Sequence, residues 1–312
     1  MSLSVDIIGD VHGRADELEA LLKKLGYREH SGSYRHSQRT ALFLGDLIDR
    51  GKDNARVVGM VRAMIDHGQA TAIMGNHEYN AICYHTEHPE TGKPLREHSA
   101  KNRNQHIEFL REYEGKPGEL RTTIDWFKAL PLFVETSSFR AVHATWHPDH
   151  ILAIQQQLNR STINDEFLLR ASVKHSPEHR LIEDTLKGME IRLPQGECFH
   201  DKDDHQRTEI RTRWWLTEAN TYQDAAMVAE DTLEKIPTVP FTSTDGLIGY
   251  GLTEPPLFIG HYWLTGKPQP LTANIGCLDY SVAKEGGALC AYRFEGEPEL
   301  SVANFVSVER IK

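Results

Sequence analysis

Three short segments near the start of the chain combine side chains that bind metal ions: GDVHG at 9–13, GDLIDRG at 45–51 and GNHE at 75–78. They supply carboxylates, imidazoles and an amide oxygen. This donor set suits Mn, Fe, Zn or Mg rather than copper or an iron–sulfur cluster. The residue types therefore predict a metal centre, and their number predicts an active site that holds two ions.

Each of these segments follows a short apolar run, at 5–8, 41–44 and 71–74. Apolar runs of this length that end at glycine are typical of buried strands in a mostly parallel sheet. Between them, residues 15–25 and 54–67 carry apolar side chains at helical spacing and are followed by glycine. The order of strand, turn and helix predicts βαβ units. Ligands at the carboxyl ends of parallel strands then converge in space.

The composition is that of an ordinary globular protein: 312 residues, 39% hydrophobic and 26% charged. No apolar stretch approaches the roughly 18 residues that span a bilayer, and no secretory signal is visible, so we expect no membrane partner. The four cysteines show neither zinc-knuckle nor disulfide spacing, which favours a cytoplasmic location. The net charge of −10 argues against an extended nucleic-acid surface, while bound cations would still permit an anionic substrate.

The pattern of expected helices and strands changes along the sequence and indicates three parts. We expect residues 1–150 to form the first part of the core, 151–240 an accessory or cap insertion, and 241–312 the second part of the core. Within the insertion we expect a strand at 206–215. We interpret the polar run HDKDDH at 200–205 as a hairpin turn, because it lacks the glycine and terminal glutamate of a calcium loop.

Taken together and in this order, the three segments resemble those of the calcineurin-like metallophosphoesterases. The DRG and NHE forms resemble the phosphoprotein-phosphatase branch, which includes bacterial diadenosine tetraphosphatases and phage-type protein phosphatases. The family completes its site with two later histidines, and His143 and His261 stand in matching contexts after short apolar runs. The resemblance implies an α/β fold with two packed mixed β-sheets flanked by helices, a four-layer sandwich, with an inserted accessory region.

The resemblance also implies the metal ligands. It places Asp10, His12 and Asp46 on the first ion, and Asp46, Asn76, His143 and His261 on the second. Manganese is the ion we expect, with Fe, Zn, Co and Mg as alternatives. A water held between two such ions gives hydroxide near neutral pH, which would attack the phosphorus directly.

Further roles follow from the same resemblance. His77 is the expected general acid, with Asp49 bonded to its other ring nitrogen, and Arg50 and Asn76 are expected to bind the phosphate. A second phosphate-binding arginine is common in this branch. Arg211 and Arg213 are the candidates, because they share a face if residues 206–215 form a strand, and we choose Arg213.

Other noticeable side chains have simpler interpretations. His85, His88, His98 and His106 lie in a polar stretch, where we expect them to be solvated. Trp146, Trp214 and Trp215 could stack on a base, although core packing is the better interpretation. Tyr262 and Trp263 follow His261, where the family often has a small hydroxyl residue, so the pocket wall differs from that of the family.

We therefore expect a dinuclear metal-dependent hydrolase that acts on a phosphomonoester or a phosphoanhydride. A nucleotide, a dinucleoside polyphosphate or another small phosphorylated compound is the expected substrate. The alternatives are a serine/threonine phosphoprotein phosphatase, a phosphodiesterase acting on nucleic-acid ends, and a metal-binding scaffold without catalysis. The sequence leaves the physiological substrate and the oligomeric state open.

Overall fold

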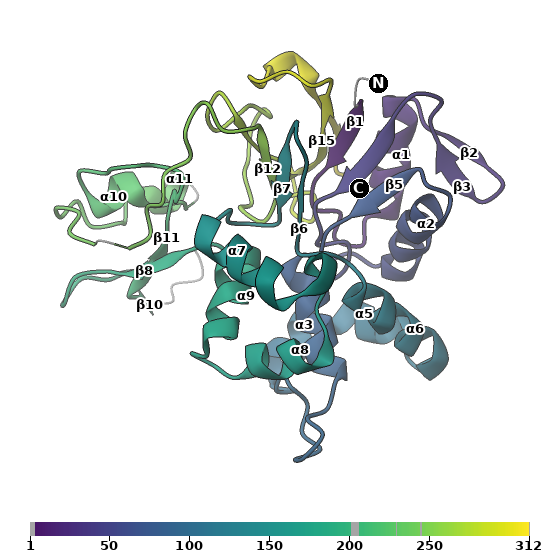
Figure 1. Ribbon diagram of the computed structural model, residues 1–312, viewed down its shortest axis with the longest axis horizontal. Helices are drawn as coiled ribbons and strands as arrows, with labels where there is room; N and C mark the ends of the chain where they lie inside the picture. Colours follow the sequence, from purple (N-terminus) through teal and green to yellow (C-terminus); the bar gives the residue numbers. More distant parts are fainter. Residues whose placement is uncertain (1–3, 201–205, 229, 244, 312) are drawn as a thin grey trace.

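The computed structural model describes residues 4–200, 206–228, 230–243 and 245–311 (Figure 1). The two main sheets contain β1 (Val5–Ile8), β4 (Thr40–Phe43), β5 (Ala70–Ala72), β6 (Phe133–Glu135), β7 (Arg140–Val142), β12 (Leu257–Ile259), β13 (Ile275–Cys277), β14 (Asp279–Tyr280), β15 (Ala288–Phe294) and β16 (Phe305–Glu309). Three small hairpins or pairs are formed by β2 (Arg28–His30), β3 (Ser33–Arg35), β8 (Glu190–Arg192), β9 (Phe199–His200), β10 (Gln206–Arg207) and β11 (Glu209–Arg211).

The helices alternate with these strands along the first half of the chain. They are α1 (Ala15–Leu25), α2 (Asn54–Asp66), α3 (Asn76–His85), α4 (Ala100–Gln105), α5 (Ile107–Glu112), α6 (Pro117–Lys128), α7 (Pro148–Gln157), α8 (Asp165–Ser172), α9 (Pro177–Lys187), α10 (Tyr222–Ala225) and α11 (Glu230–Leu233). Short 3-10 turns occur at η1 (Asn159–Ser161) and η2 (Val302–Asn304). In the described part of the chain, no helix has both the length and the apolar character needed to cross a bilayer.

Both main sheets are mixed. The first has the order β14-β15-β1-β4-β5, with β16 beside β15. In it β1, β4 and β5 run parallel, whereas β15 is antiparallel to β1. The second has the order β13-β12-β7-β6, with β12 parallel to both of its neighbours and β6 antiparallel to β7. The predicted α/β fold with two mixed sheets and flanking helices is confirmed.

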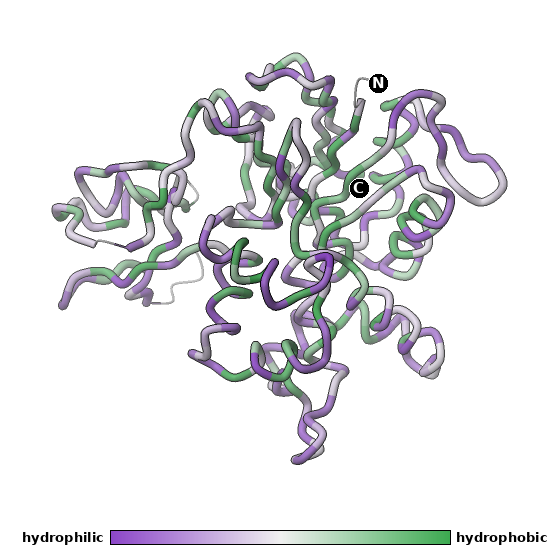
Figure 2. Tube along the Cα trace, viewed as in Figure 1, coloured by the Kyte–Doolittle hydropathy of each residue, from purple (hydrophilic) through white to green (hydrophobic). Residues whose placement is uncertain are grey.

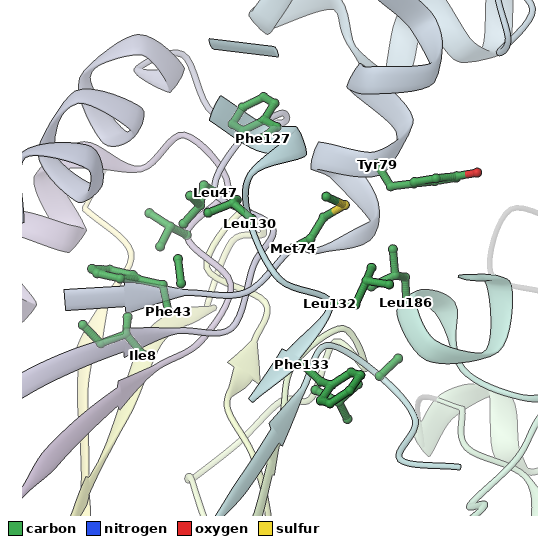
Figure 3. Close-up of a cluster of buried hydrophobic side chains, with 14 of the residues drawn as sticks. Ile8, Phe43, Leu47, Met74, Tyr79, Phe127, Leu130, Leu132, Phe133 and Leu186 are labelled. Atoms are coloured by element: carbon green, nitrogen blue, oxygen red, sulfur yellow. The ribbon is translucent and has the colours of Figure 1, made fainter. Parts of the chain in front are cut away.

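The strands bury both faces, because successive side chains point to opposite sides. On β1, Val5 and Ile7 join a cluster between the two sheets that also contains Phe258 and Tyr292. Ile8 points the other way, into the large cluster formed with the helices. In Figure 3 that large cluster joins Ile8 and Phe43 to side chains from α6 and α9. The colouring in Figure 2 is accordingly greenest along the central strands.

The accessory region contributes to two different places in the fold. Helices α7, α8 and α9 lie around α3, and their apolar side chains belong to the main core (Figure 1). The short strands β8–β11 with α10 and α11 extend away from the sheets as a lobe (Figure 1). This lobe has its own small cluster, which includes Ile191, Phe199 and Ile210. The boundary predicted at residue 150 lies inside α7.

The structure describes part of what the sequence predicted for this region and for the tryptophans. The strand predicted at 206–215 is interrupted, and its longer piece, β11, ends at Arg211 because the chain turns there, with the Arg213 N–H donating to Ala225 O. Of residues 200–205, interpreted as a hairpin turn, 201–205 lie outside the described residues. Trp146, Trp214 and Trp215 are buried in the main cluster, which confirms the core interpretation.

Candidate active site and metal centre

Five loops at the carboxyl ends of β1, β4, β5, β7 and β12 bring the predicted side chains together. The backbones of these loops are unusual: His12, Asp46, Asp49, Arg50 and His261 all have positive φ, between 49° and 69°. Non-glycine residues rarely adopt this conformation, and it persists where the surrounding structure enforces it. Because the residues with positive φ are concentrated in these loops, backbone strain is concentrated at the site.

The loops also approach one another closely, which requires glycine at the contacts. Gly45 has a φ of 91°, and a Cβ on it would lie 2.3 Å from the backbone nitrogen of Gly75. A Cβ on Gly260 would lie 2.2 Å from a carboxylate oxygen of Asp10. Since real Cβ atoms do not come this close to other atoms, a larger residue would push the loops apart.

His12, Asp46 and His77 form the first group of side chains that could hold an ion. Their ligand atoms lie within 4.8 Å of one another, and all three residues are buried. His12 donates from Nδ1 to Ile48 O at 3.1 Å, so its Nε2, which has no hydrogen-bond partner, lies 3.8 Å from Asp46 Oδ2. Burial and the neighbouring His77 lower the pKa of His12 to about 3. A neutral imidazole with a free nitrogen is the form that binds metal.

Asp46 belongs equally to a second group, with His143 and His261. Asn76 Oδ1 lies 3.2 Å from His143 Nε2 and 2.7 Å from His261 Nδ1, so the amide oxygen faces both imidazoles. His143 donates from Nδ1 to Leu44 O at 2.7 Å, which directs its other nitrogen to the same point. Although burial opposes it, the charge of Asp46 raises the pKa of His143 to about 10. The position thus favours a positive charge, which a divalent cation would supply in place of the proton.

Asp10 adds negative charge beside these groups. Its carboxylate is buried and accepts the His261 backbone N–H at 3.1 Å. Burial and the nearby Asp279 raise the pKa of Asp10 well above its usual value. Asp279, which the sequence reasoning did not single out, accepts the backbone N–H groups of Trp263 and Ser281. Buried carboxylates, imidazoles and an amide oxygen together fit divalent cations, so the residues present suit two ions, with Asp46 in both groups of ligands.

The predicted pair of His77 and Asp49 is formed, and a third residue extends it. His77 donates from Nδ1 to Asp49 Oδ2 at 2.6 Å, and His106 donates from Nδ1 to Asp49 Oδ1 at 2.7 Å. Against the effect of burial, these two imidazoles hold the pKa of Asp49 at about 2. The ring of His106 stacks on Phe109, with 4.5 Å between ring centroids. The expectation that His106 is solvated is wrong, because it is 5% exposed.

Replacing His106 with asparagine is expected to lower kcat for an aryl phosphate on the order of tenfold, because Asp49 would lose one of the two donors that orient it. The measurement is steady-state kinetics at saturating metal. His98→Asn is the matched control, since His98 stacks on Tyr84 and makes no contact with Asp49. Equal rates for both variants would remove His106 from the site.

Glu78 ties two of the site loops together. Its Oε2 accepts the backbone N–H groups of Asp46 at 2.8 Å and Gly75 at 2.9 Å, and its Oε1 accepts that of Leu47 at 2.8 Å. The side chain is fully buried, and burial together with Asp46 raises its pKa to about 7. The glutamate of the GNHE segment is therefore a structural support for the loop that carries Asp46.

Glu78→Ala is expected to lower the free energy of unfolding by about 3 kcal/mol or more, because it leaves three buried N–H donors without an acceptor. Glu78→Gln should fall between this variant and the parent protein, since an amide retains one acceptor oxygen. Urea unfolding measures the difference. The exposed Glu87→Ala should change it by less than about 0.5 kcal/mol, and an equal loss in that control would contradict the assignment.

Arg50 is held by an aromatic ring rather than by a carboxylate. Its guanidinium lies 3.9 Å from the centre of the Trp263 ring, and Lys284 Nζ approaches the same ring at 4.2 Å. The Trp263 ring also lies 5.4 Å from that of His12. The departure from the family pattern after His261 thus places an indole against the predicted phosphate-binding arginine, where a cation–π contact orients it.

The arginine that lies at the site beside Arg50 is Arg211, whereas the predicted Arg213 lies elsewhere. Arg211 lines the same cleft as Arg50 and His261, whereas Arg213 lines a separate cavity with Trp215. The physical reason is that β11 ends at Arg211. The period-2 alternation that would have put both side chains on one face therefore stops there.

A family model described as calcineurin-like phosphoesterase matches residues 3–207. Among curated relatives, the asymmetrical bis(5'-nucleosyl)-tetraphosphatase PrpE of Oceanobacillus iheyensis is 47% identical over 76 residues, 24% of this chain and 30% of that protein. The corresponding enzyme of Bacillus velezensis is 35% identical over 125 residues, 37% of this chain and 50% of that protein. This chain therefore spans half or less of the length of these relatives.

A solved structure of a protein serine/threonine phosphatase from Saccharomyces cerevisiae shares the fold. It has a TM-score of 0.51 and 14% identity and covers 100% of this chain and 81% of its own. The family model matches more than half of the chain and includes all of the site residues up to His143. The chain therefore belongs to the calcineurin-like phosphoesterase family.

Proposed function

We propose that this protein is a metal-dependent phosphoesterase that hydrolyses a phosphomonoester or phosphoanhydride bond in a small phosphorylated substrate. A single observation supports this most strongly: two groups of potential ligands share Asp46, and His77, a member of one of them, is bonded to the carboxylate of Asp49. The relatives named as bis(5'-nucleosyl)-tetraphosphatases make a nucleotide or dinucleoside polyphosphate the substrate we favour.

His12 and Asp46, with Asp10, would hold one divalent ion, and Asp46, Asn76, His143 and His261 the other. Manganese is the ion we propose. When bound, such ions polarise the phosphoryl oxygens and lower the pKa of a coordinated water. The chain itself contributes the shape and charge of the site, and it excludes solvent from the ligand atoms, which are buried.

His77 is placed to give a proton to the leaving oxygen. Its Nδ1–H is occupied by Asp49, so Nε2 is the atom available to the substrate, 3.8 Å from Asp46 Oδ2. Burial alone would lower the pKa of His77, but the carboxylates of Asp46 and Asp49 raise it. A raised pKa favours the protonated imidazole, which is the form that a general acid requires.

Arg50 and Arg211 are the proposed ligands for the phosphoryl oxygens. Both line the cleft that contains Asn76, His77 and His261. Guanidinium groups donate paired hydrogen bonds to phosphate oxygens and offset the charge that develops there during transfer. Arg211 is also within reach of Glu190, with 3.4 Å between Nη2 and Oε1.

Removal of metal tests the proposal directly. Treatment with a chelator is expected to abolish hydrolysis of 4-nitrophenyl phosphate, and added manganese should restore it. Diadenosine tetraphosphate and a phosphopeptide, compared at equal metal loading, then separate the favoured substrate from the alternative of a protein phosphatase. Full activity in a preparation shown by elemental analysis to be free of metal would refute the proposal.

A further inference from the structure

A cleft of about 810 Å³ extends from the site well beyond the space that one phosphoryl group needs. Helix α3 contributes Asn76, His77, Asn80 and Cys83 to its lining. Residues between 94 and 105 also line it. The accessory region contributes the end of α8 and, from α9, His179, Glu183 and Lys187.

The lining of this cleft is basic although the chain as a whole carries a net charge of −10. Six cationic side chains line it against the two carboxylates of Glu97 and Glu183: Arg50, Arg96, Lys101, Lys174, Lys187 and Arg211. Lys187 is paired with Glu183. Of the remaining five, only Arg50 and Arg211 lie beside the metal groups, so positive charge continues along the cleft past the place of the reaction.

Among these distal cations, Arg96 is fixed by three hydrogen bonds. Its Nη1 donates to Asn80 Oδ1 at 2.8 Å, and its Nη2 donates to Asn102 Oδ1 at 2.9 Å and Gln105 Oε1 at 3.1 Å. These partners are neutral amides. Within the part of the chain that the structure describes, no carboxylate lies within ion-pair distance of Arg96. A guanidinium fixed by amides keeps its full charge for a ligand.

The position of Arg96 relates it to the leaving group. Asn80, which holds Arg96, follows His77 by three residues on α3, so the two side chains are neighbours on one face of the helix, with Cβ atoms roughly 5–6 Å apart. His77, Asn80 and Arg96 also line a small pocket together with Asp49 and His106. Because His77 faces the leaving oxygen in the proposed reaction, Arg96 lies on the leaving-group side of the cleft.

We propose that Arg96, supported by the distal lysines of the cleft, forms a second anion subsite that binds a phosphate group on the leaving side of the scissile bond. This proposal rests on the proposed function and adds to it the preference for a chain of phosphates over a lone monoester. In the reaction, water oxygen bonds to the attacked phosphorus and the bond to the bridging oxygen breaks. The bridging oxygen takes the proton of His77, and the proton that the attacking water loses restores the protonated form of His77.

Changing the partner of Arg96 tests the subsite without removing the arginine. Gln105→Glu is isosteric and places a carboxylate against Arg96 Nη2, which neutralises its charge. Arg96→Gln removes the charge outright. Each variant should lower the ratio of kcat/KM for inorganic tripolyphosphate to kcat/KM for 4-nitrophenyl phosphate about tenfold, mainly through a higher KM for tripolyphosphate. Gln155→Glu, an exposed position on α7 outside the cleft, is the matched control and should leave the ratio unchanged.

A binding measurement separates this proposal from the proposed function. Calorimetry of tripolyphosphate with the manganese-loaded His77→Asn protein, with and without Gln105→Glu, should show a Kd about tenfold higher in the double variant. Circular dichroism establishes that each variant is folded. If 4-nitrophenyl phosphate is not hydrolysed by the parent protein, the proposed function fails, while the calorimetry still decides on the subsite. An unchanged Kd, or an unchanged ratio in folded Gln105→Glu, would overturn the subsite.

Discussion

Asp46→Asn is expected to lower kcat for 4-nitrophenyl phosphate by on the order of 10³-fold or more. Asp46 is the one carboxylate common to both groups of potential ligands, and it also lies 3.4 Å from His143 Nε2. The amide retains the shape of the side chain but removes the charge that two cations would share. The loss of several kcal/mol of transition-state stabilisation corresponds to a rate effect of this size.

The metal content distinguishes the cause of this loss. Elemental analysis of the purified Asp46→Asn protein should find less metal per chain than the parent protein. Asp53→Asn is the matched control, because Asp53 lies at the far end of the same loop and its side chain makes no capping hydrogen bond to α2. Activity of Asp46→Asn at the level of the parent protein would refute the two-ion site.

His77→Asn is expected to lower kcat by about 10²- to 10⁴-fold, the contribution typical of a positioned general acid. The effect should be larger for an alkyl phosphate than for 4-nitrophenyl phosphate, because nitrophenolate leaves without needing a proton. The kinetics of the two substrates, measured side by side, give this dependence. Within the described residues, His77 and His106 are the two histidines that bond to Asp49, and each contacts a different carboxylate oxygen.

Two results would contradict the role of His77 as an acid. An equal loss on both substrates would indicate a role that does not depend on the leaving group. His77 lies in one group of potential ligands with His12 and Asp46. A loss of bound metal in His77→Asn would therefore indicate that His77 is a metal ligand. The exposed His30→Asn should behave as the parent protein does.

Each predicted metal-site residue lies shortly after the end of a strand. Short connections set the order of these strands in the sheet, and the residues therefore lie together. Buried runs such as Val5–Ile8 are recognisable from hydrophobicity alone, and the carboxyl ends of parallel strands meet at one edge. For Asp10, Asp46 and Asn76, position along the chain was therefore enough to predict proximity. The second sheet follows the same logic with His143 and His261.

His106, Glu78 and Arg96 were not foreseen as contributors because their surroundings are decided by distant segments. His106 stands in a polar stretch that carries no local sign of burial, and it is buried because Phe109 and Asp49 enclose it. Glu78 was visible in the GNHE segment, but its partners are backbone groups of another loop. The amides that hold Arg96 come from two helices, with Asn80 on α3 and Asn102 and Gln105 on α4.

The sequence by itself determined the family, the alternation of strands and helices, and the residues that gather at the strand ends, because these depend on residue type and on local periodicity. The tertiary structure decided which arginine completes the site, which side chains support it, and how the accessory helices widen it into a basic cleft. These features depend on where β11 ends and on how α9 and residues 94–105 lie against α3. Contacts between segments far apart in the chain determine both the end of β11 and this packing against α3. No local sequence pattern predicts such contacts.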